Sequence, residues 1–290
     1  KVAVSRRGDN SLRFFAADYG ERKRTSIPNL KYKREDRWAN NPKGVIWAIL
    51  NKGGVLKGMD ITISSSIPEK IGLGSSAALS IATAWAVKGL YGLGFSKKEI
   101  VDIVHTSETS FNNIHKTVTD LYGTLFSKKN YAMFFDAREK KYDFIPINLK
   151  EYSILITLAN VPHVSIGKEL EQKKVMCQEC VSQLNNRKSG TSLRDYTPED
   201  LQYLLGKVEE TKRRVCMHVV EENQRVIDAR RAFIKKDMAT YGKLLNRSHE
   251  SLRDNYEISC PEVDWLVKRA LELDGVLGAR LFGKGFAGGA

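Results

Sequence analysis

Residues 67–85 read I-P-E-K-I-G-L-G-S-S-A-A-L-S-I-A-T-A-W and place a turn with two glycines between a strand and a helix. The preceding run Ile61-Thr62-Ile63 is β-branched, which favours a strand, and Pro68 ends it. Gly72 and Gly74 permit a tight turn because neither carries a Cβ atom. From residue 77 onward apolar residues recur at three- and four-residue spacing, which predicts a helix.

Ser75 and Ser76 stand at the start of this predicted helix, where serine is a preferred N-cap. A helix N-terminus that follows small residues offers N–H groups and the positive end of the helix dipole to a phosphate. The alternative is an ordinary glycine turn before a capped helix. The stretch lacks the Lys of a G-x-x-x-x-G-K-S/T loop and the third glycine of G-x-G-x-x-G. It therefore favours phosphate binding without matching either of those loops.

Length and composition bound the class of protein. The 290 residues suffice for one large domain or two ordinary ones, and no run of 18 apolar residues predicts a membrane span. The N-terminus has no signal-peptide core. The net charge of +13 is spread over scattered basic pairs, with denser clusters only at residues 22–24 and 31–37 and no interleaved aromatics. We therefore expect a solvated basic surface and no nucleic-acid partner.

The four cysteines, at positions 177, 180, 216 and 260, include one C-x-x-C pair. This pair lies inside a helical pattern without a second ligand pair, so we expect neither a metal nor a redox role. Few cysteines and no export signal predict a reducing, cytoplasmic setting.

The order of predicted elements indicates an α+β fold with a mixed sheet and two domains, residues 1–158 and 159–290. In the first, residues 2–7 and 12–17 form a predicted hairpin, residues 19–37 a loop, and a helix follows that Asn40 or Asn41 caps. Ser96 caps a helix that runs through Glu108. Further strands are expected at residues 131–135, 152–158 and 276–282. Helices are expected at residues 168–184, 199–205, 207–234, 238–252 and 261–273, with Asp237 and Ser259 as caps.

Few side chains in this pattern could serve phosphoryl transfer, which needs a held nucleotide, a bridging cation and a carboxylate at the attacking hydroxyl. Ser75 and Ser76 could bind phosphate oxygens or the metal, and Glu108 could be a Mg²⁺ ligand. Asp120 could orient or deprotonate a hydroxyl. A surface acid or a helix cap is the alternative for each carboxylate. Trp38 could either pack against the core or form a flat wall for a base.

Four separate stretches resemble galactokinases of the GHMP kinase superfamily, in the same order. They are residues 38–45 (W-A-N-N-P-K-G-V), residues 72–78 (G-L-G-S-S-A-A), residues 248–264 (S-H-E-S-L-R-D-N-Y-E-I-S-C-P-E-V-D) and residues 278–290 (G-A-R-L-F-G-K-G-F-A-G-G-A). The third match is long and therefore specific, and together the four span essentially the whole chain.

The resemblance implies a two-domain GHMP kinase fold and a role for each matching residue. Trp38 would flank adenine, and Asp120 would be the catalytic Asp, acting as a base or positioning carboxylate. Ser76 and Glu108 would hold Mg²⁺. The phosphate loop for ATP would be formed by Gly72, Gly74, Ser75 and Ser76. A further Gly-rich motif near the phosphates and the sugar would be formed by Gly283, Gly285, Gly288 and Gly289.

The chain departs from the family on the sugar side. The first family motif, G-R-V-N-L-I-G-E-H-T-D-Y, has no counterpart, as in a fragment or after a real loss. Thr117-Val-Thr-Asp120-Leu121 replaces G-I-M-D-Q, Leu170 replaces a sugar-contacting Tyr, and Lys284 replaces a glycine. We expect a cytoplasmic, monomeric kinase for galactose or a related sugar, with ATP and Mg²⁺. The alternative is a non-catalytic sugar and nucleotide sensor with a regulatory protein partner.

Overall fold

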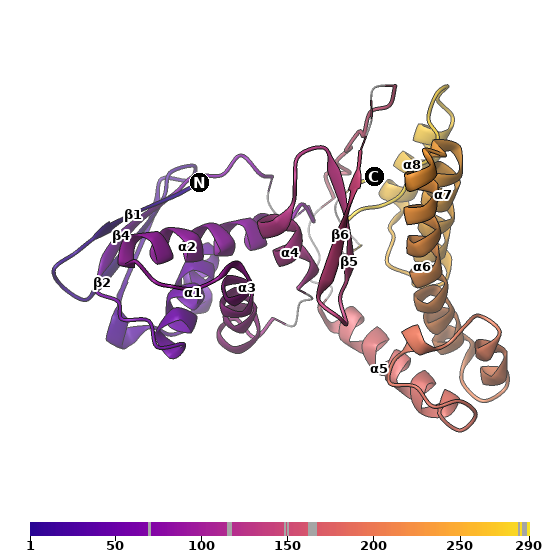
Figure 1. Cartoon of the computed structure of the whole chain (residues 1–290), viewed down its shortest axis with the longest axis horizontal. Coiled ribbons are helices and arrows are strands. Elements are labelled where there is room, and N and C mark those ends of the chain that lie inside the picture. The colour runs from indigo at the N-terminus through magenta and orange to yellow at the C-terminus, as the bar shows by residue number, and fades with distance from the viewer. Residues whose placement is uncertain are drawn as a thin grey trace. The chain divides into compact units, whose positions relative to one another are not determined.

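The structure is a computed structural model that describes residues 1–68, 71–114, 118–147, 149, 151–161, 167–283, 285, 289 and 290. The chain divides into two compact units. The first comprises residues 1–69 and 73–147, and the second comprises residues 70–72 and 148–290. The chain trace of both units is drawn in Figure 1. The predicted domain boundary at residues 158/159 stays a prediction.

The sheet of the first unit has four strands in the order β1-β4-β2-β3, so the predicted hairpin of residues 2–7 and 12–17 is wrong. The strands are β1 (Val2–Arg6), β2 (Ser11–Ala16), β3 (Glu21–Ser26) and β4 (Met59–Ile63). Strand β4 lies between β1 and β2, antiparallel to the first and parallel to the second. Strand β3 also replaces part of the loop predicted for residues 19–37. The sheet is mixed, as predicted.

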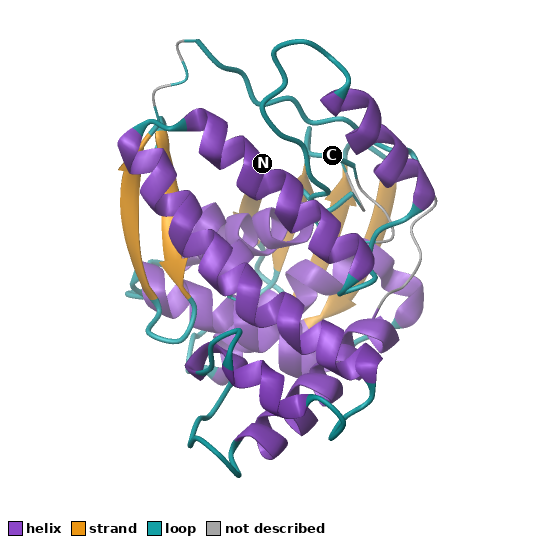
Figure 2. Cartoon of the chain, turned by 90° about the vertical axis from the view of Figure 1, so that its right-hand side faces the viewer, coloured by secondary structure: helices purple, strands orange, loops and turns teal. Residues whose placement is uncertain are grey.

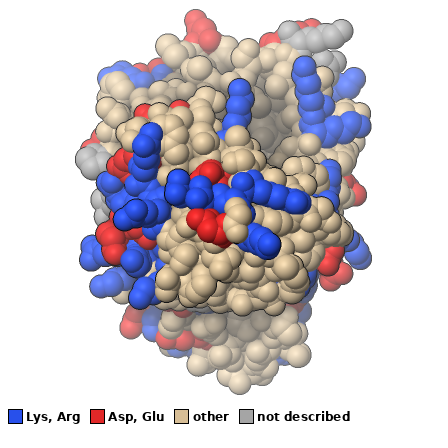
Figure 3. Space-filling view, turned by 90° about the vertical axis from the view of Figure 1, so that its left-hand side faces the viewer, with Lys and Arg blue, Asp and Glu red and all other residues tan. Residues whose placement is uncertain are grey.

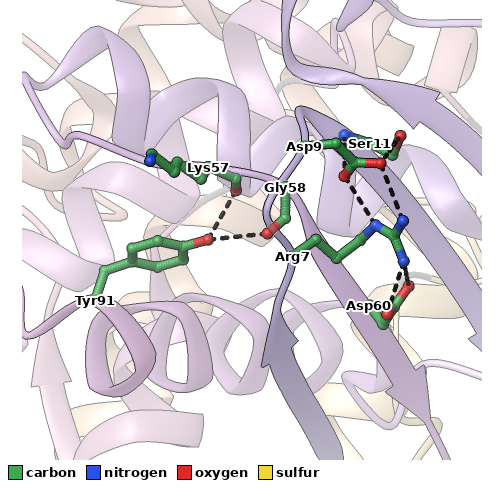
Figure 4. A network of polar contacts seen from close by, with 7 residues as sticks. All are labelled: Arg7, Asp9, Ser11, Lys57, Gly58, Asp60 and Tyr91. Atoms are coloured by element: carbon green, nitrogen blue, oxygen red, sulfur yellow. Dashed lines mark hydrogen bonds and ion pairs between the residues drawn. The ribbon is translucent and has the colours of Figure 1, made fainter.

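Contacts at the turn after β1 explain why the predicted hairpin does not close. The N–H of Arg7 donates to the carbonyl of Gly58, and the N–H of Gly58 donates to the carbonyl of Asp9. A Cβ atom on Gly58 would lie 2.5 Å from the carbonyl oxygens of both Asp9 and Ser11. The Arg7 guanidinium also joins Asp9 to Asp60 (Figure 4). Only glycine at position 58 leaves room for the start of β4 beside this turn. Strand β4 therefore lies between β1 and β2.

Helices cover one face of this sheet and form the core of the first unit. They are α1 (Asn40–Asn51), α2 (Ser75–Tyr91), α3 (Lys97–Thr106), a π-helical turn η3 (Ser107–Phe111) and α4 (Thr119–Phe126). Leu12 and Phe14 of β2 pack with Ile46 and Ile49 of α1 and with Ala84 of α2. Two short 3₁₀ helices, η1 (Ile27–Asn29) and η2 (Arg34–Ala39), precede α1, and a hairpin of β5 (Tyr131–Asp136) and β6 (Lys141–Pro146) follows α4.

The helix caps agree with the sequence at some ends and not at others. Ser96 forms a capping box with Glu99, and Asp237 accepts from the N–H of Thr240, both as predicted. Asn40 is the first residue of α1 and does not cap it, because its side chain bonds the backbone N–H and C=O of Lys33. Likewise Cys260, not Ser259, is the N-cap of the last helix, and Ser259 donates to Asp264 instead.

The second unit is mainly helical, as predicted. Its elements are α5 (Gly167–Leu184), the 3₁₀ turns η4 (Leu193–Asp195) and η5 (Asp200–Leu204), α6 (Glu210–Lys235), α7 (Met238–Asp254) and α8 (Pro261–Leu271). Figure 2 looks onto these helices. The longest is α6, and α7 packs beside it. The strands predicted for residues 152–158 and 276–282 are wrong: in the described chain they are reduced to single bridges of Gly289 with Leu158 and Phe282.

A disulfide joins Cys180 of α5 to Cys216 of α6, whereas Cys177 and Cys260 are free thiols. The C-x-x-C residues therefore do not act as a pair, and sequence spacing missed the partner on the next helix. Within the described residues no cluster of three potential metal ligands occurs. Over the same part of the chain, no helix is both long and apolar enough to cross a membrane.

Candidate active site

The helix start at residues 74–76 differs from the predicted serine cap. Gly74 is the N-cap of α2, in a left-handed conformation with φ +72°, and Ser75 and Ser76 are the first two helical residues. The serine hydroxyls therefore stand in the first turn, and the N-cap residue has no side chain with which to cover the helix end. A helix start of this kind presents N–H groups and the positive dipole end to an anion.

The two Gly-rich motifs meet at a backbone contact. Gly72 has φ +85° and Gly283 has φ +83°, a region that L side chains rarely adopt. A Cβ atom on Gly72 would lie 2.5 Å from the Cα of Gly283, and one on Gly283 would lie 3.1 Å from the Cα of Gly72. Motifs more than 200 positions apart are thus in direct contact, and only glycine at both positions allows it.

Gly285 completes the second turn with φ +87°. A Cβ atom there would lie 2.3 Å from the carbonyl oxygen of Ile258, so the turn also rests on the backbone that follows α7. Gly289 pairs with Leu158 and Phe282. Lys284 and Gly288, singled out in the sequence, lie outside the described residues.

Glu108 is carried by the π-helical turn η3 that continues α3. Its side chain is 2 % exposed. The turn packs against α1 at Gly44, where a Cβ atom would lie 2.4 Å from the hydroxyl of Ser107 and 3.0 Å from the ring of Phe111. Single π turns inside helices occur frequently at functional sites. The glycine of the W-A-N-N-P-K-G-V stretch therefore makes room for the turn that carries the predicted metal ligand.

Asp120 is the second residue of α4, and it is exposed. Helix α4 packs on α2, and the first turns of both helices contribute to one core cluster through Ala77 and Leu121. The core thus holds the helix that carries the predicted catalytic Asp against the helix that starts at Ser75. Thr117, at the start of the altered family motif, lies outside the described residues.

Trp38 lies in η2, just before α1, and its role is partly resolved by its contacts. Its indole Nε1 donates to the Glu21 carboxylate at 2.9 Å, and its ring packs against the core of the first unit. This hydrogen bond, together with Arg37, holds the pKa of Glu21 below its usual value. These contacts show that part of Trp38 serves in packing, the residue as a whole is half-buried, and its role as a flat wall for a base stays a prediction.

Two further residues beside the second turn were missed by the sequence. Asn246 and His249, both on α7, accept backbone N–H groups from Ala279 and Leu281, at 2.8 and 3.4 Å. His249 is 2 % exposed, and this burial lowers the pKa of its imidazole, against the opposing charge of Asp264. The available signal was the long match at residues 248–264, which contains His249 and Asp264 but does not tell what they hold.

The distribution of surface charge does not assign a function more specifically. Figure 3 shows Lys and Arg side chains in a band across one face, with acidic side chains beside them. Among the charged side chains of the first unit, Arg37 pairs with Glu21, and Arg7 pairs with Asp9 and Asp60. The expectation of no nucleic-acid partner stays a prediction.

Comparison with known proteins gives consistent family matches. Residues 40–128 match the GHMP kinases N terminal domain, and residues 229–288 match the GHMP kinases C terminal domain. A galactokinase from Thermotoga maritima is 37 % identical over 259 residues, which are 89 % of this chain and 72 % of the relative. A galactokinase from Streptococcus thermophilus is 33 % identical over 99 % of this chain and 75 % of the relative.

Solved structures agree. The crystal structure of Lactococcus lactis galactokinase complexed with galactose matches with a TM-score of 0.91 and 27 % identity, covering 98 % of this chain and 74 % of that one. Mevalonate kinase from Methanococcus jannaschii matches with a TM-score of 0.58 and 20 % identity, covering 99 % of this chain and 78 % of that one. The second likeness shows the fold alone.

Proposed function

This chain belongs to the galactokinases of the GHMP kinase family, and from that premise we propose that it transfers the γ-phosphoryl group of ATP to a hydroxyl of galactose or a closely related sugar. It is a phosphotransferase with an alcohol group as acceptor. The protein's task in such a reaction is to hold the nucleotide, to neutralise its charge and to position the attacking hydroxyl.

The contact between Gly72 and Gly283 carries the proposal. It brings two left-handed G-x-G turns together, and one of them leads through Gly74 into the start of α2. Backbone N–H groups can approach phosphate oxygens closely only where no Cβ atom intervenes. We therefore assign Gly72, Gly74, Ser75, Ser76, Gly283 and Gly285 to the binding of the ATP phosphates, and we keep Trp38 as the neighbour of adenine.

The donor set of Ser76 and Glu108 fits Mg²⁺. This ion prefers oxygen ligands and is usually held by one or two carboxylates together with substrate phosphates and water. One buried carboxylate and one hydroxyl in a first helical turn match that preference. Bound Mg²⁺ would neutralise charge on the β- and γ-phosphates, and the two side chains would fix its place relative to the helix start.

Asp120 is the residue we assign to the sugar hydroxyl. A carboxylate can accept a hydrogen bond from the attacking hydroxyl, orient its lone pair towards phosphorus and take its proton as the bond forms. Its place in the first turn of α4 keeps it on a regular element, while its side chain remains exposed. Galactose is the sugar we propose, and Leu170, in the first turn of α5, is the altered position most relevant to that choice.

A panel of hexoses tests this function. The purified chain is incubated with ATP·Mg²⁺ and galactose, glucose, mannose or N-acetylgalactosamine, and ADP release is followed beside binding of ATP and sugar by calorimetry. ADP release that depends on galactose is expected. Binding of both ligands without ADP release would overturn the kinase proposal and support the sensor alternative. The same sample, run on a sizing column with light scattering, tests the proposed monomer.

The cellular compartment of the protein can also be tested directly. We propose the cytoplasm, where ATP is available, although a disulfide such as Cys180–Cys216 is more common in oxidising compartments. Thiol alkylation of the protein in freshly lysed cells, followed by mass spectrometry, distinguishes the two. Four alkylated cysteines support a reducing setting, and alkylation of Cys177 and Cys260 alone contradicts it.

A further inference from the structure

Helix α7 holds the segment that leads into the second G-x-G turn through one stripe of residues. Gly242, Asn246 and His249 are spaced four and three positions apart, which puts them on one face of the helix. The N–H of Ala279 donates to Asn246 Oδ1 at 2.8 Å, and the N–H of Leu281 donates to His249 Nδ1 at 3.4 Å. The two donors are alternate residues of the segment, so they lie on the same edge of the backbone.

At Gly242, the first residue of this stripe, the backbone of the helix contacts the backbone of the segment. A Cβ atom on Gly242 would lie 2.1 Å from the carbonyl oxygen of Leu277, and one on Gly278 would lie 2.3 Å from the carbonyl oxygen of Gly242. The segment therefore touches the helix at Gly242 and is bound to it at Asn246 and His249. These contacts fix both its distance from α7 and its register along the helix.

The arrangement around His249 selects one tautomer. Because Nδ1 accepts from the N–H of Leu281, the ring proton must sit on Nε2. Nε2 lies 3.3 Å from Asp264 Oδ1 of α8, although the two are not aligned as a hydrogen bond, and Ser259 Oγ donates to the same oxygen. Glu250, Arg253 and Arg280 carry the other charges near the imidazole. Asp264 thus faces the protonated nitrogen, and the accepting nitrogen is turned to the segment.

We propose that Asn246 and His249 are positioning residues for ATP, acting through the backbone of residues 279–283. They fix the position of the segment on α7, and with it the position at which Gly283 contacts Gly72. The shape of the turn assigned to the phosphates depends on that contact. This inference rests on the proposed function, because it names further residues of the same site. Neither side chain is assigned a contact with substrate.

The chain offers matched variants that keep or remove each acceptor atom. Asn246→Asp keeps an oxygen at Oδ1, whereas Asn246→Leu removes it at similar size. His249→Asn keeps an acceptor at the place of Nδ1, because both atoms are bonded to Cγ. His249→Gln instead puts its polar atoms at the place of Nε2, towards Asp264. Arg247→Gln, at an exposed position of the same helix, is the control for helix stability.

We expect Asn246→Leu and His249→Gln each to raise the KM for ATP about ten-fold, the size typical of leaving one buried or partly buried N–H unpaired. The KM for the sugar should change less than two-fold. Amide exchange at Ala279 and Leu281 should accelerate about ten-fold in the same variants. Asn246→Asp and His249→Asn should recover most of both effects, and Arg247→Gln should match the wild type.

Equal behaviour of the paired variants, or a rise in both KM values together, would overturn the proposal, since a merely structural role does not depend on which acceptor atom remains. If a His249 variant does not fold, the Asn246 pair decides alone. Amide exchange and the affinity for a fluorescent ATP analogue need no turnover. A wild type that fails to phosphorylate any sugar therefore refutes the proposed function while these two measurements still decide the positioning role.

Discussion

The two G-x-G turns of the molecule begin at Gly72 and Gly283, and their glycines have similar positive φ values but are held in place by different means. Their glycines have φ values of +85° and +72° in the first turn and +83° and +87° in the second. The first runs straight into α2, whose hydrogen-bonded backbone fixes everything from Ser75 onward. The second follows an irregular segment that α7 holds with two side chains. The glycines of the two turns thus have similar φ values, but the first turn is supported by a regular helix and the second by side chains that are distant in the sequence.

The largest effect is expected where neither turn is touched. Asp120→Asn should lower kcat about 1,000-fold, because the amide cannot take the proton of the attacking hydroxyl, while both turns and the affinity for ATP stay intact. ADP release and calorimetric titration with ATP measure the two quantities. Gly123→Ala in the same helix is the control, since a Cβ atom there meets nothing within 4 Å. Equal rates for Asp120→Asn and wild type would remove this carboxylate from the mechanism.

The difference between the turns also explains how much the sequence predicts. The turn at Gly72–Gly74, the helix after it, the Ser96 cap and the helices of the second unit follow from spacing over a few residues. The strand order does not, because it depends on Gly58 passing between Asp9 and Ser11. The acceptors Asn246 and His249 were missed for the same reason: they bind a segment more than 30 positions away, and no local pattern records such a contact.

The next largest effect is expected on the stability of the first unit, which contains α2. Lys43 is 2 % exposed, and its ammonium is bound by Asp36 at 2.7 Å and by Asn40 at 3.3 Å. Asp36→Ala leaves this buried charge without its counter-ion and should lower the free energy of unfolding by about 3–5 kcal/mol. Urea unfolding followed by tryptophan fluorescence measures it. Glu35→Ala, at the exposed neighbouring position, should change little, and equal midpoints for the two variants would contradict the role of the pair.

A smaller effect tests whether the two turns act together. Gly72→Ala should raise the KM for ATP about 100-fold, because the new Cβ atom would lie 2.5 Å from the Cα of Gly283 at a positive φ. Gly283→Ala meets Gly72 at 3.1 Å and should raise it less, about ten-fold. The double variant should fall short of the product of the two, since both disturb one contact. Gly89→Ala, inside α2 with nothing within 4 Å, controls for helix effects.

The smallest expected effect is a loss of stability at low pH in α6 and α7, the helices that hold the second turn. His218 of α6 stacks on Tyr256 with ring centroids 4.6 Å apart, and its Nδ1 lies 2.9 Å from Ser251 Oγ of α7. Burial lowers the pKa of His218 to about 4, although the nearby Glu222 opposes the shift. Arg225, Arg280 and Lys173 are the other charges close to this ring. The histidine is therefore neutral in the folded protein at neutral pH.

The sign of the effect follows from which state binds more protons. The unfolded chain protonates His218 near its ordinary pKa of about 6.5, whereas the folded unit resists protonation until about pH 4. Stability is therefore complete above pH 6.5 and declines as pH falls towards 4, by about 2 kcal/mol at pH 5. His249, whose pKa burial also lowers, adds to the decline. Amide exchange at pH 7 and pH 5 should show the loss in α6 and α7, which hold the second turn. In His218→Gln the loss should be smaller, and an acid response as steep as in the wild type would show that this histidine does not set it.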